Sequence, residues 1–282
     1  MSKVIAGTSG ARRFARYLAA PVSALLEHGN LTRELAQRDI LGRYRGASFG
    51  LMWSLFGPLL MLVIYTIAFG KILGARWNQV SGDTAAFGMV LFLGILTHGF
   101  FAECLTRAPR LMVENANYVK RVVFPLHVLP WSVVLAALFH MLMNIVVFVV
   151  LNLVLFGKFS AHIVFAPLVI LPLVLVTISV TLMFASLGVF IRDINQATPV
   201  IATAMLFLSS AIVPVDTLPP HYQRIFHLNP LTFFIDQMRE VALWGRFPDW
   251  SGLMIATAAG VVLLFLSHAW FRRTSKGFAD VL

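Results

Sequence analysis

The chain has 282 residues, of which 59% are hydrophobic and only 12% are charged. An ordinary soluble domain is about 45–50% apolar and about 25% charged, so this composition excludes a soluble globular protein and a disordered chain. The single cysteine, Cys104, excludes a disulfide framework and a cysteine-based zinc site. The sequence therefore predicts an all-α integral membrane protein.

The formal net charge is +10, because 22 Lys and Arg residues outnumber 12 Asp and Glu residues. In a soluble protein this balance would suggest a nucleic-acid partner. In a membrane protein, basic residues instead keep loops on the cytoplasmic side and contact anionic lipid. We therefore expect membrane lipid, and no nucleic acid, among the partners.

Residues 1–50 are predicted to form a cytosolic N-terminal segment. Their first half carries apolar residues at helical spacing, typical of a helix that lies on the membrane surface: Phe14, Leu18, Val22 and Leu25. Leu31–Arg45 follows as an arginine-rich interfacial helix. Its Arg38, Arg43 and Arg45 could bind a lipid phosphate or diphosphate through forked hydrogen bonds. Alternatively, they could only set the topology and contact lipid.

Residues 51–282 are predicted to form a domain with six transmembrane helices. A hydrocarbon core of about 30 Å requires about 20 apolar residues in a helix. The stretches that qualify are Leu51–Leu73, Ala85–Leu105, Leu126–Phe156, Ile163–Phe190, Thr198–Val215 and Ser251–Phe271. The first 30 residues lack the compact apolar segment and cleavage site of a signal peptide, so we expect the first span to direct insertion and to stay.

The distribution of basic residues predicts the orientation. With both termini in the cytoplasm, 16 of the 22 Lys and Arg residues fall in inner segments and 6 in outer ones. Because cytoplasmic loops carry an excess of Lys and Arg, the sequence predicts a multi-pass protein with both termini inside.

The inner loop of residues 107–125 mixes apolar, amide and charged residues between Pro109 and Pro125. This pattern suits a short cytosolic helix that docks into a groove of a partner. It also suits an amphipathic surface loop without a partner.

The outer loop of residues 214–250 contains many aromatic residues and is predicted to form two short helices broken at Asn229-Pro230. These aromatics could enter the outer leaflet, close a channel mouth or form a dimer contact.

The spans contain few polar residues that could do chemistry. No Asp, Lys or Arg lies in the middle of a span, whereas ion-coupled carriers need charges at membrane depth. The sequence also lacks a GxxxxGK[ST] loop, so we do not expect the chain itself to hydrolyse ATP. His98, Glu103, His140 and Asn144 could line a water-filled path or form hydrogen bonds between helices. We expect no metal site, because no third ligand has suitable spacing.

Five short motifs occur in order among the predicted spans. They are Arg38-Asp39-Ile40 with Arg43-Tyr44-Arg45, Ser48-Phe49-Gly50, Trp53 and Pro58; Asn115 to Leu126 with Leu129-Pro130; Arg192-Asp193-Ile194; Asn229-Pro230-Leu231-Thr232; and Gly277 to Leu282. From about Leu31 to the C-terminus, the chain resembles the permease subunits of polysaccharide-export ABC transporters, which are type-2 ABC permeases.

This resemblance implies a homodimer in the bacterial inner membrane, with two copies of a cytosolic ABC ATPase. The chain would be a transport subunit and not an enzyme. It would need no cofactor of its own, since ATP and magnesium would bind the partner. The cargo would be a lipid-linked polysaccharide of the O-antigen, capsule or teichoic acid type. The loop of residues 107–125 would couple to the ATPase through Glu114, Asn115, Asn117, Tyr118, Lys120 and Arg121.

A path for a glycan needs flat aromatic surfaces and weak hydrogen-bonding groups, because strong binding would stall a moving polymer. Candidates for this lining are Trp53, Phe56, Tyr65, Phe207, Ser209 and Ser210. Each aromatic could equally face lipid or pack between helices. The loop of residues 214–250 would gate the outer exit through Tyr222, Phe226, Phe233 and Phe234.

Three alternatives remain open. The first is an ATP-driven permease for a small molecule such as a drug or haem. The second is an ion-coupled carrier, which would need a buried carboxylate pair. The third is a membrane-embedded glycolipid transferase, which would need clustered carboxylates or histidines near one interface. Four acidic residues do fall on one side, without metal-like spacing: Asp216, Asp236, Glu240 and Asp249.

Overall fold

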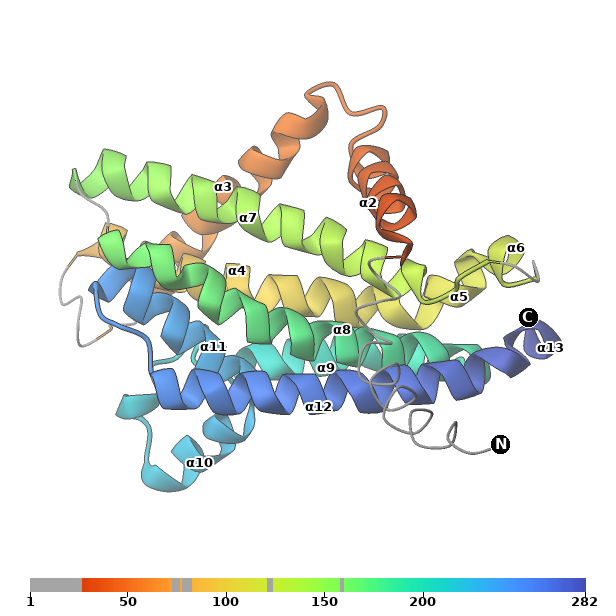
Figure 1. Cartoon of the computed structure of the whole chain (residues 1–282). Coiled ribbons are helices and arrows are strands. Elements are labelled where there is room, and N and C mark those ends of the chain that lie inside the picture. Colours follow the sequence, from red (N-terminus) through yellow and green to blue (C-terminus); the bar gives the residue numbers. More distant parts are fainter. Residues whose placement is uncertain (1–26, 73–76, 78–82, 121–123, 158–159) are drawn as a thin grey trace, which may run out of the picture.

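A computed structural model describes residues 27–72, 77, 83–120, 124–157 and 160–282. The described residues form helices and turns without a strand (Figure 1). The α-helices are α2 (Gly29–Arg43), α3 (Trp53–Tyr65), α4 (Thr84–Arg107), α5 (Leu111–Glu114), α6 (Ala116–Val119), α7 (Val128–Phe156), α8 (Ala166–Phe190), α9 (Ile194–Phe207), α10 (Pro220–Leu228), α11 (Pro230–Arg239), α12 (Trp250–Thr274) and α13 (Phe278–Val281). The predicted surface helix around Phe14–Leu25 lies outside the described residues.

Five helical segments are long and apolar enough to cross a membrane. They are Trp53–Ile72, Thr84–Glu114, Val128–Phe156, Ala161–Phe190 and Trp250–Val281. They correspond to five of the six predicted spans. The structure thus confirms an all-helical chain with several apolar spans, without confirming the sixth as a full-length helix.

The predicted fifth span, Thr198–Val215, is helical only as far as Phe207. The 14 residues of α9 rise about 21 Å, which is less than the hydrocarbon core requires. The side-chain amide of Asn229 donates to the carbonyls of Met205 and Leu208, at 2.8 and 3.0 Å. The Ser209 hydroxyl donates to the carbonyl of Leu206. These bonds satisfy the last carbonyls of α9, so the chain can turn there.

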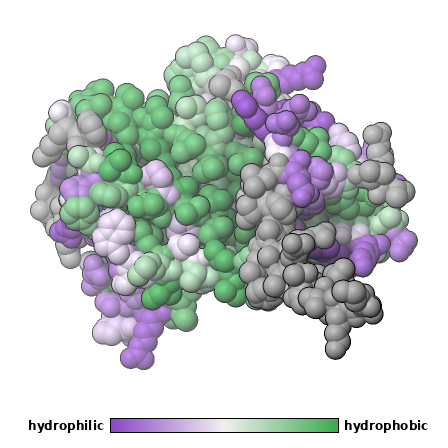
Figure 2. Space-filling view, in the orientation of Figure 1, coloured by the Kyte–Doolittle hydropathy of each residue, from purple (hydrophilic) through white to green (hydrophobic). Residues whose placement is uncertain are grey.

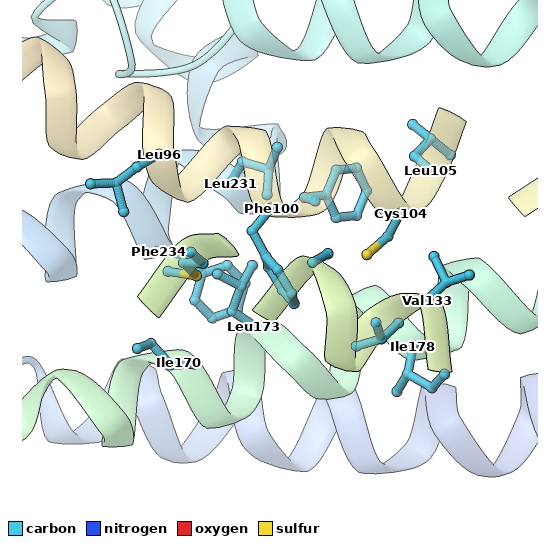
Figure 3. Packing of buried hydrophobic residues seen from close by; sticks show 14 of the residues in the cluster. Leu96, Phe100, Cys104, Leu105, Val133, Ile170, Leu173, Ile178, Leu231 and Phe234 are labelled. Atoms are coloured by element: carbon cyan, nitrogen blue, oxygen red, sulfur yellow. The ribbon is translucent and has the colours of Figure 1, made fainter. Parts of the chain in front are cut away.

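The core surrounds α4, which packs against α7, α8, α9 and α11. Figure 3 shows Phe100 of α4 close to Leu173 of α8 and Phe234 of α11. The remaining long helix, α12, lies along α8. A Cβ atom on Gly260 of α12 would lie 2.9 Å from the Cβ of Leu175, so glycine permits this close approach.

The outer surface has the polarity expected of a membrane protein. Figure 2 shows hydrophobic side chains across the middle of the visible face, with hydrophilic ones at α2 and near α10. Exposed apolar residues occur along α7, α8 and α12, for example Val150, Leu171 and Ile255. The span Trp53–Ile72 is the most exposed, because none of its most apolar window is buried.

The predicted interfacial helix corresponds to α2, which packs on α7 by burying Thr32, Leu35 and Ala36. The predicted single coupling helix is instead two short turns, α5 and α6, separated at Asn115. The predicted break at Asn229-Pro230 separates α10 from α11, as expected.

Candidate functional site

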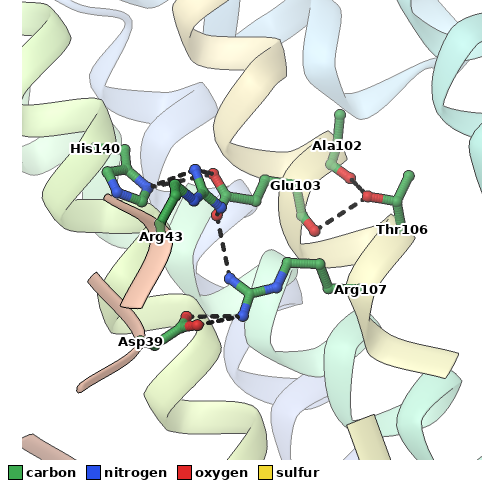
Figure 4. Close-up of polar contacts among 7 residues, drawn as sticks. All are labelled: Asp39, Arg43, Ala102, Glu103, Thr106, Arg107 and His140. Carbon is green, nitrogen blue, oxygen red and sulfur yellow. Dashed lines mark hydrogen bonds and ion pairs between the residues drawn. The ribbon is translucent and has the colours of Figure 1, made fainter. Parts of the chain in front are cut away.

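The charged residues of α2, α4 and α7 meet near the end of the bundle that carries α5 and α6 (Figures 1 and 4). Arg43, the last residue of α2, donates hydrogen bonds to the carboxylate of Glu103 on α4. The Nδ1 atom of His140 on α7 lies 3.1 Å from Arg43 and 3.4 Å from Glu103. One carboxylate therefore joins three helices. We call the set of Asp39, Arg43, Glu103, Arg107 and His140 the ion network.

Arg107, one turn beyond Glu103 on α4, extends this ion network. Its Nη2 atom lies 2.7 Å from both oxygens of Asp39 on α2, and its Nη1 atom lies 3.2 Å from Glu103. The Glu103 side chain is only 18% exposed, so its interactions are screened less than those of surface ion pairs. Because α2 buries few apolar residues, these contacts help fix it against the bundle.

Two cavities adjoin the ion network. A cavity of about 270 Å³ lies between α2, α5 and α7, and is lined by Arg38, Asp39, Arg43 and Arg107. A second, of about 230 Å³, is lined by Arg43, Glu103 and His140 as well as Trp53 and Asn144. Tyr44 also lines the second cavity, where burial, together with the charge of Glu103, raises its pKa.

A third cavity, also of about 230 Å³, is mainly apolar and is lined by Tyr65 and Leu91. It shares Pro58, Leu96, Gly99 and Asn144 with the second cavity. The second and third cavities thus adjoin along α3, α4 and α7, and their walls change from charged to apolar.

The three arginines predicted to bind phosphate have different surroundings. Arg38 lies in the charged cavity and donates to the Tyr118 hydroxyl at 3.2 Å. Arg43 is held by the ion network. Arg45 is exposed, and its guanidinium has no hydrogen bond or ion pair within the described part of the chain. The sequence interpretation missed Asp39 and Arg107 as partners, although Glu103 and Arg107 are four apart on one helix and could interact.

The predicted coupling residues divide into anchors and exposed positions. Tyr118 accepts from Arg38 and stacks on Phe124, with ring centroids 4.6 Å apart. Asn115 donates to the carbonyl of Leu111. By contrast, Glu114, Asn117 and Lys120 are exposed. Arg121 lies outside the described residues.

The predicted lining residues do not share one surface. Trp53 and Tyr65 line the second and third cavities, whereas Phe56 and Phe207 lie on the exposed apolar surface. Ser209 and Ser210 are buried.

Of the predicted gate residues, Tyr222 is exposed and Phe233 is half-buried. The other two, Phe226 and Phe234, are buried.

The polar residues within the spans connect helices. His98 of α4 lies 2.9 Å from the carbonyl of Ala202 on α9 through its Nε2 atom, and Glu103 connects α4 to α7. Asn144 lines both the second and the third cavity. In the part of the chain that the structure describes, no three His, Cys, Asp or Glu side chains are grouped as metal ligands.

Residues 30–243 match the sequence profile described as "ABC-2 type transporter". The chain belongs to the ABC-2 type transporter family. Among its relatives, this ABC-2 type transporter is 26% identical to "O-antigen export system permease protein RfbA" of Myxococcus xanthus, over 92% of the chain and 98% of the relative. It is 25% identical to a Klebsiella pneumoniae protein of the same name, over 88% of this chain and 93% of that relative.

A third relative is "Polysialic acid transport protein KpsM" of Escherichia coli, which is 23% identical over 83% of this chain and 90% of its own length. These names confirm the resemblance to polysaccharide-export permeases that the motifs indicated.

Proposed function

We propose that this ABC-2 type transporter is the permease subunit of an ATP-driven exporter of a lipid-linked polysaccharide, of the O-antigen, capsule or teichoic acid type. The observation that carries the proposal is the alignment with relatives named for O-antigen export, which covers nearly the full length of both proteins. The chain would sit in the bacterial inner membrane as a homodimer with two separate ATPase subunits. ATP and magnesium would bind those subunits.

The cavity between α2, α5 and α7 is the proposed site for the lipid phosphate or diphosphate. Arg38 and Arg43 line it and can donate forked hydrogen bonds to phosphate oxygens. A phosphate that bound Arg43 would compete with Glu103 for its guanidinium. Glu103 would keep Arg107 as a partner, so this exchange would not leave its charge unpaired. Arg45 would contact the headgroup from outside the cavity.

The exposed residues Glu114, Asn117 and Lys120 form the proposed contact with the ATPase. Movement of this segment would reach α2 through the bond between Tyr118 and Arg38. It would also reach α8, because a Cβ atom on Gly188 would lie 2.2 Å from the carbonyl oxygen of Pro109. A movement that the ATPase imposes on this segment would therefore reach the proposed phosphate site.

The proposed topology has six crossings, with both termini in the cytoplasm. The fifth crossing would consist of α9 and the turn that follows it. α5, α6 and the C-terminal α13 lie at one end of the bundle and α10 at the other, which supports a cytoplasmic end and an outer end (Figure 1). The second chain of the homodimer would cover the exposed apolar surface of α3.

A tagged pull-down from native membranes in mild detergent, followed by an ATPase assay, tests the proposal. We expect a soluble Walker-containing subunit to co-purify with ATP hydrolysis. We also expect deletion of the gene to leave lipid-linked polysaccharide inside the cell. Normal surface polysaccharide in the deletion strain, with an ATPase that still co-purifies, would favour the small-molecule permease instead.

A further inference from the structure

A separate cavity of about 170 Å³ lies at the end of the bundle that carries α10 and α11, opposite α5 and α6 (Figure 1). Its walls include Trp77, which is buried, and Trp244, which is half-buried. The polar side chains that line it include Asp216, Asp236, Glu240 and His227. None of the proposed roles above uses these groups.

Arg239 forms the rigid base of this cavity. Although it belongs to the predicted outer loop of residues 214–250, its side chain is only 2% exposed. The guanidinium donates to the backbone carbonyls of Val90 at 3.0 and 3.1 Å, Ser210 at 2.7 Å and Ala211 at 3.0 Å. The central carbon of the guanidinium, Cζ, lies 4.4 Å from the centroid of the Trp77 ring. Arg239 is therefore a positioning residue, since its donors are already occupied.

The acidic residues supply acceptors at the open side of the cavity. Asp236 lies 3.5 Å from Arg239, yet its side chain remains 43% exposed. Glu240 lies 3.6 Å from Arg246, and Asp216 is exposed. Burial raises the pKa of Asp236, and the nearby charge of Asp216 raises it further. Because carboxylates only accept hydrogen bonds, a ligand here must bring hydroxyl or amine donors.

We infer that this cavity binds one uncharged sugar ring of the exported glycan and disfavours acidic sugars. The half-buried indole of Trp244 can pack against the apolar face of a sugar ring, and the carboxylates can accept hydrogen bonds from its hydroxyls. Drug-sized pockets are about 300–1,000 Å³, so this smaller cavity suits a single ring. Three carboxylates against Arg239 and Arg246 leave a net negative charge, which repels a carboxylate or phosphate on the sugar.

This inference rests on the proposed function, and it restricts the exported glycan to one built mainly from uncharged sugars. A glycan whose units carry carboxylates would meet like charges at this end of the bundle. The successive rings of a neutral glycan would occupy this one site in turn. Their binding would be weak, and weak binding allows a polymer to keep moving.

Saturation-transfer NMR on the full chain in lipid nanodiscs tests the site with two probes, neutral mannotriose and an acidic sialic acid trimer. We expect transfer to the ring protons of the neutral probe and much less to the acidic one. Trp244→Phe and Asp216→Asn should each weaken binding of the neutral probe about two- to tenfold, the effect of one lost contact of this kind. Asp216 is exposed, so its replacement should leave the fold intact.

Two matched variants serve as controls. Trp250→Phe changes an exposed indole outside the cavity, and Asp193→Asn removes an exposed carboxylate from the α8–α9 connection. Both should bind mannotriose like the wild type. Equal binding by Trp244→Phe, Asp216→Asn and the wild type would overturn the proposal, as would equal transfer to the two probes.

The same preparations separate this site from the proposed function. If mannotriose does not bind while the chain still co-purifies an ATPase and supports export, the sugar site is wrong and the exporter stands. If neutral sugar binds in a Trp244-dependent manner but export and the ATPase are absent, the cavity is supported and the exporter is wrong.

Discussion

Glu103 has more side-chain partners than any other residue of the ion network. It contacts Arg43 on α2, Arg107 on α4 and His140 on α7. Replacing a largely buried carboxylate that has several partners lowers the stability of the fold, because the charges of those partners are then left uncompensated. Its position therefore stabilises α2 against the bundle and holds Arg43 in place.

Glu103→Gln should destabilise the protein by about 1–3 kcal/mol, because the amide cannot balance the charges of Arg43 and Arg107. Thermal unfolding in detergent, followed by tryptophan fluorescence, measures the change. Glu114→Gln is the control, since Glu114 is exposed and has no ion pair in the described structure. Equal melting temperatures for the two variants would show that the network does not stabilise the fold.

Replacing Arg38, Arg43 and Arg45 together with alanine should abolish export while the chain remains in the membrane with its ATPase. The reason is the loss of the guanidinium groups at the proposed phosphate site. Surface polysaccharide and the pull-down are measured in parallel. Arg273→Ala, which changes an exposed arginine near the C-terminus, should leave export unchanged. Normal export in the triple variant would exclude the phosphate role.

At the scale of elements, α9 shows how side chains outside a helix decide its length. The residues after Phe207 are apolar enough for the helix to continue, so hydropathy predicted a longer span. The Asn229 side chain instead donates to the carbonyl of Met205 in α9 and to that of Leu208 just after it, and it caps α11, where its oxygen accepts from the amide of Leu231 at 3.0 Å. One residue thus ends one helix and begins another.

Asn229→Ala should cost about 2 kcal/mol, because it removes two hydrogen bonds and a helix cap. Asn229→Ser can restore the cap but not the bonds to α9, so its melting temperature should lie between the alanine variant and the wild type. Asn117→Ala, at an exposed position, is the control. A wild-type melting temperature for Asn229→Ala would contradict the proposed role of this side chain.

At the scale of the whole molecule, the bundle leaves one apolar span almost uncovered. None of the most apolar window of Trp53–Ile72 is buried, whereas 72% of the corresponding window of Thr84–Glu114 is buried. Its side chains Trp53 and Tyr65 also line cavities on the bundle side. A second chain that packs here would cover the exposed apolar surface of this span.

In a Cys104→Ala background, single cysteines at Leu60, Ile64 or Ile67 should give disulfide-linked dimers in native membranes under mild oxidation. Exposed positions on the far helix α12, Met254 and Leu266, should not. A disulfide requires Cα atoms about 4–7 Å apart, so several positions are scanned. Dimers that form only from α12 would place the interface elsewhere, and their absence from every position would argue against a homodimer through α3.

The sequence by itself determined the membrane class, the positions of five apolar spans, the arginine-rich α2 and the break at Asn229-Pro230. These features depend on composition, on windows of about 20 residues and on local turn chemistry, which are properties of neighbouring residues. Only the tertiary structure decided where α9 ends, which partners hold Arg43 and that Arg239 is buried. Those outcomes depend on contacts between residues 21, 60 and 149 positions apart, and no local pattern in the chain specifies such pairs.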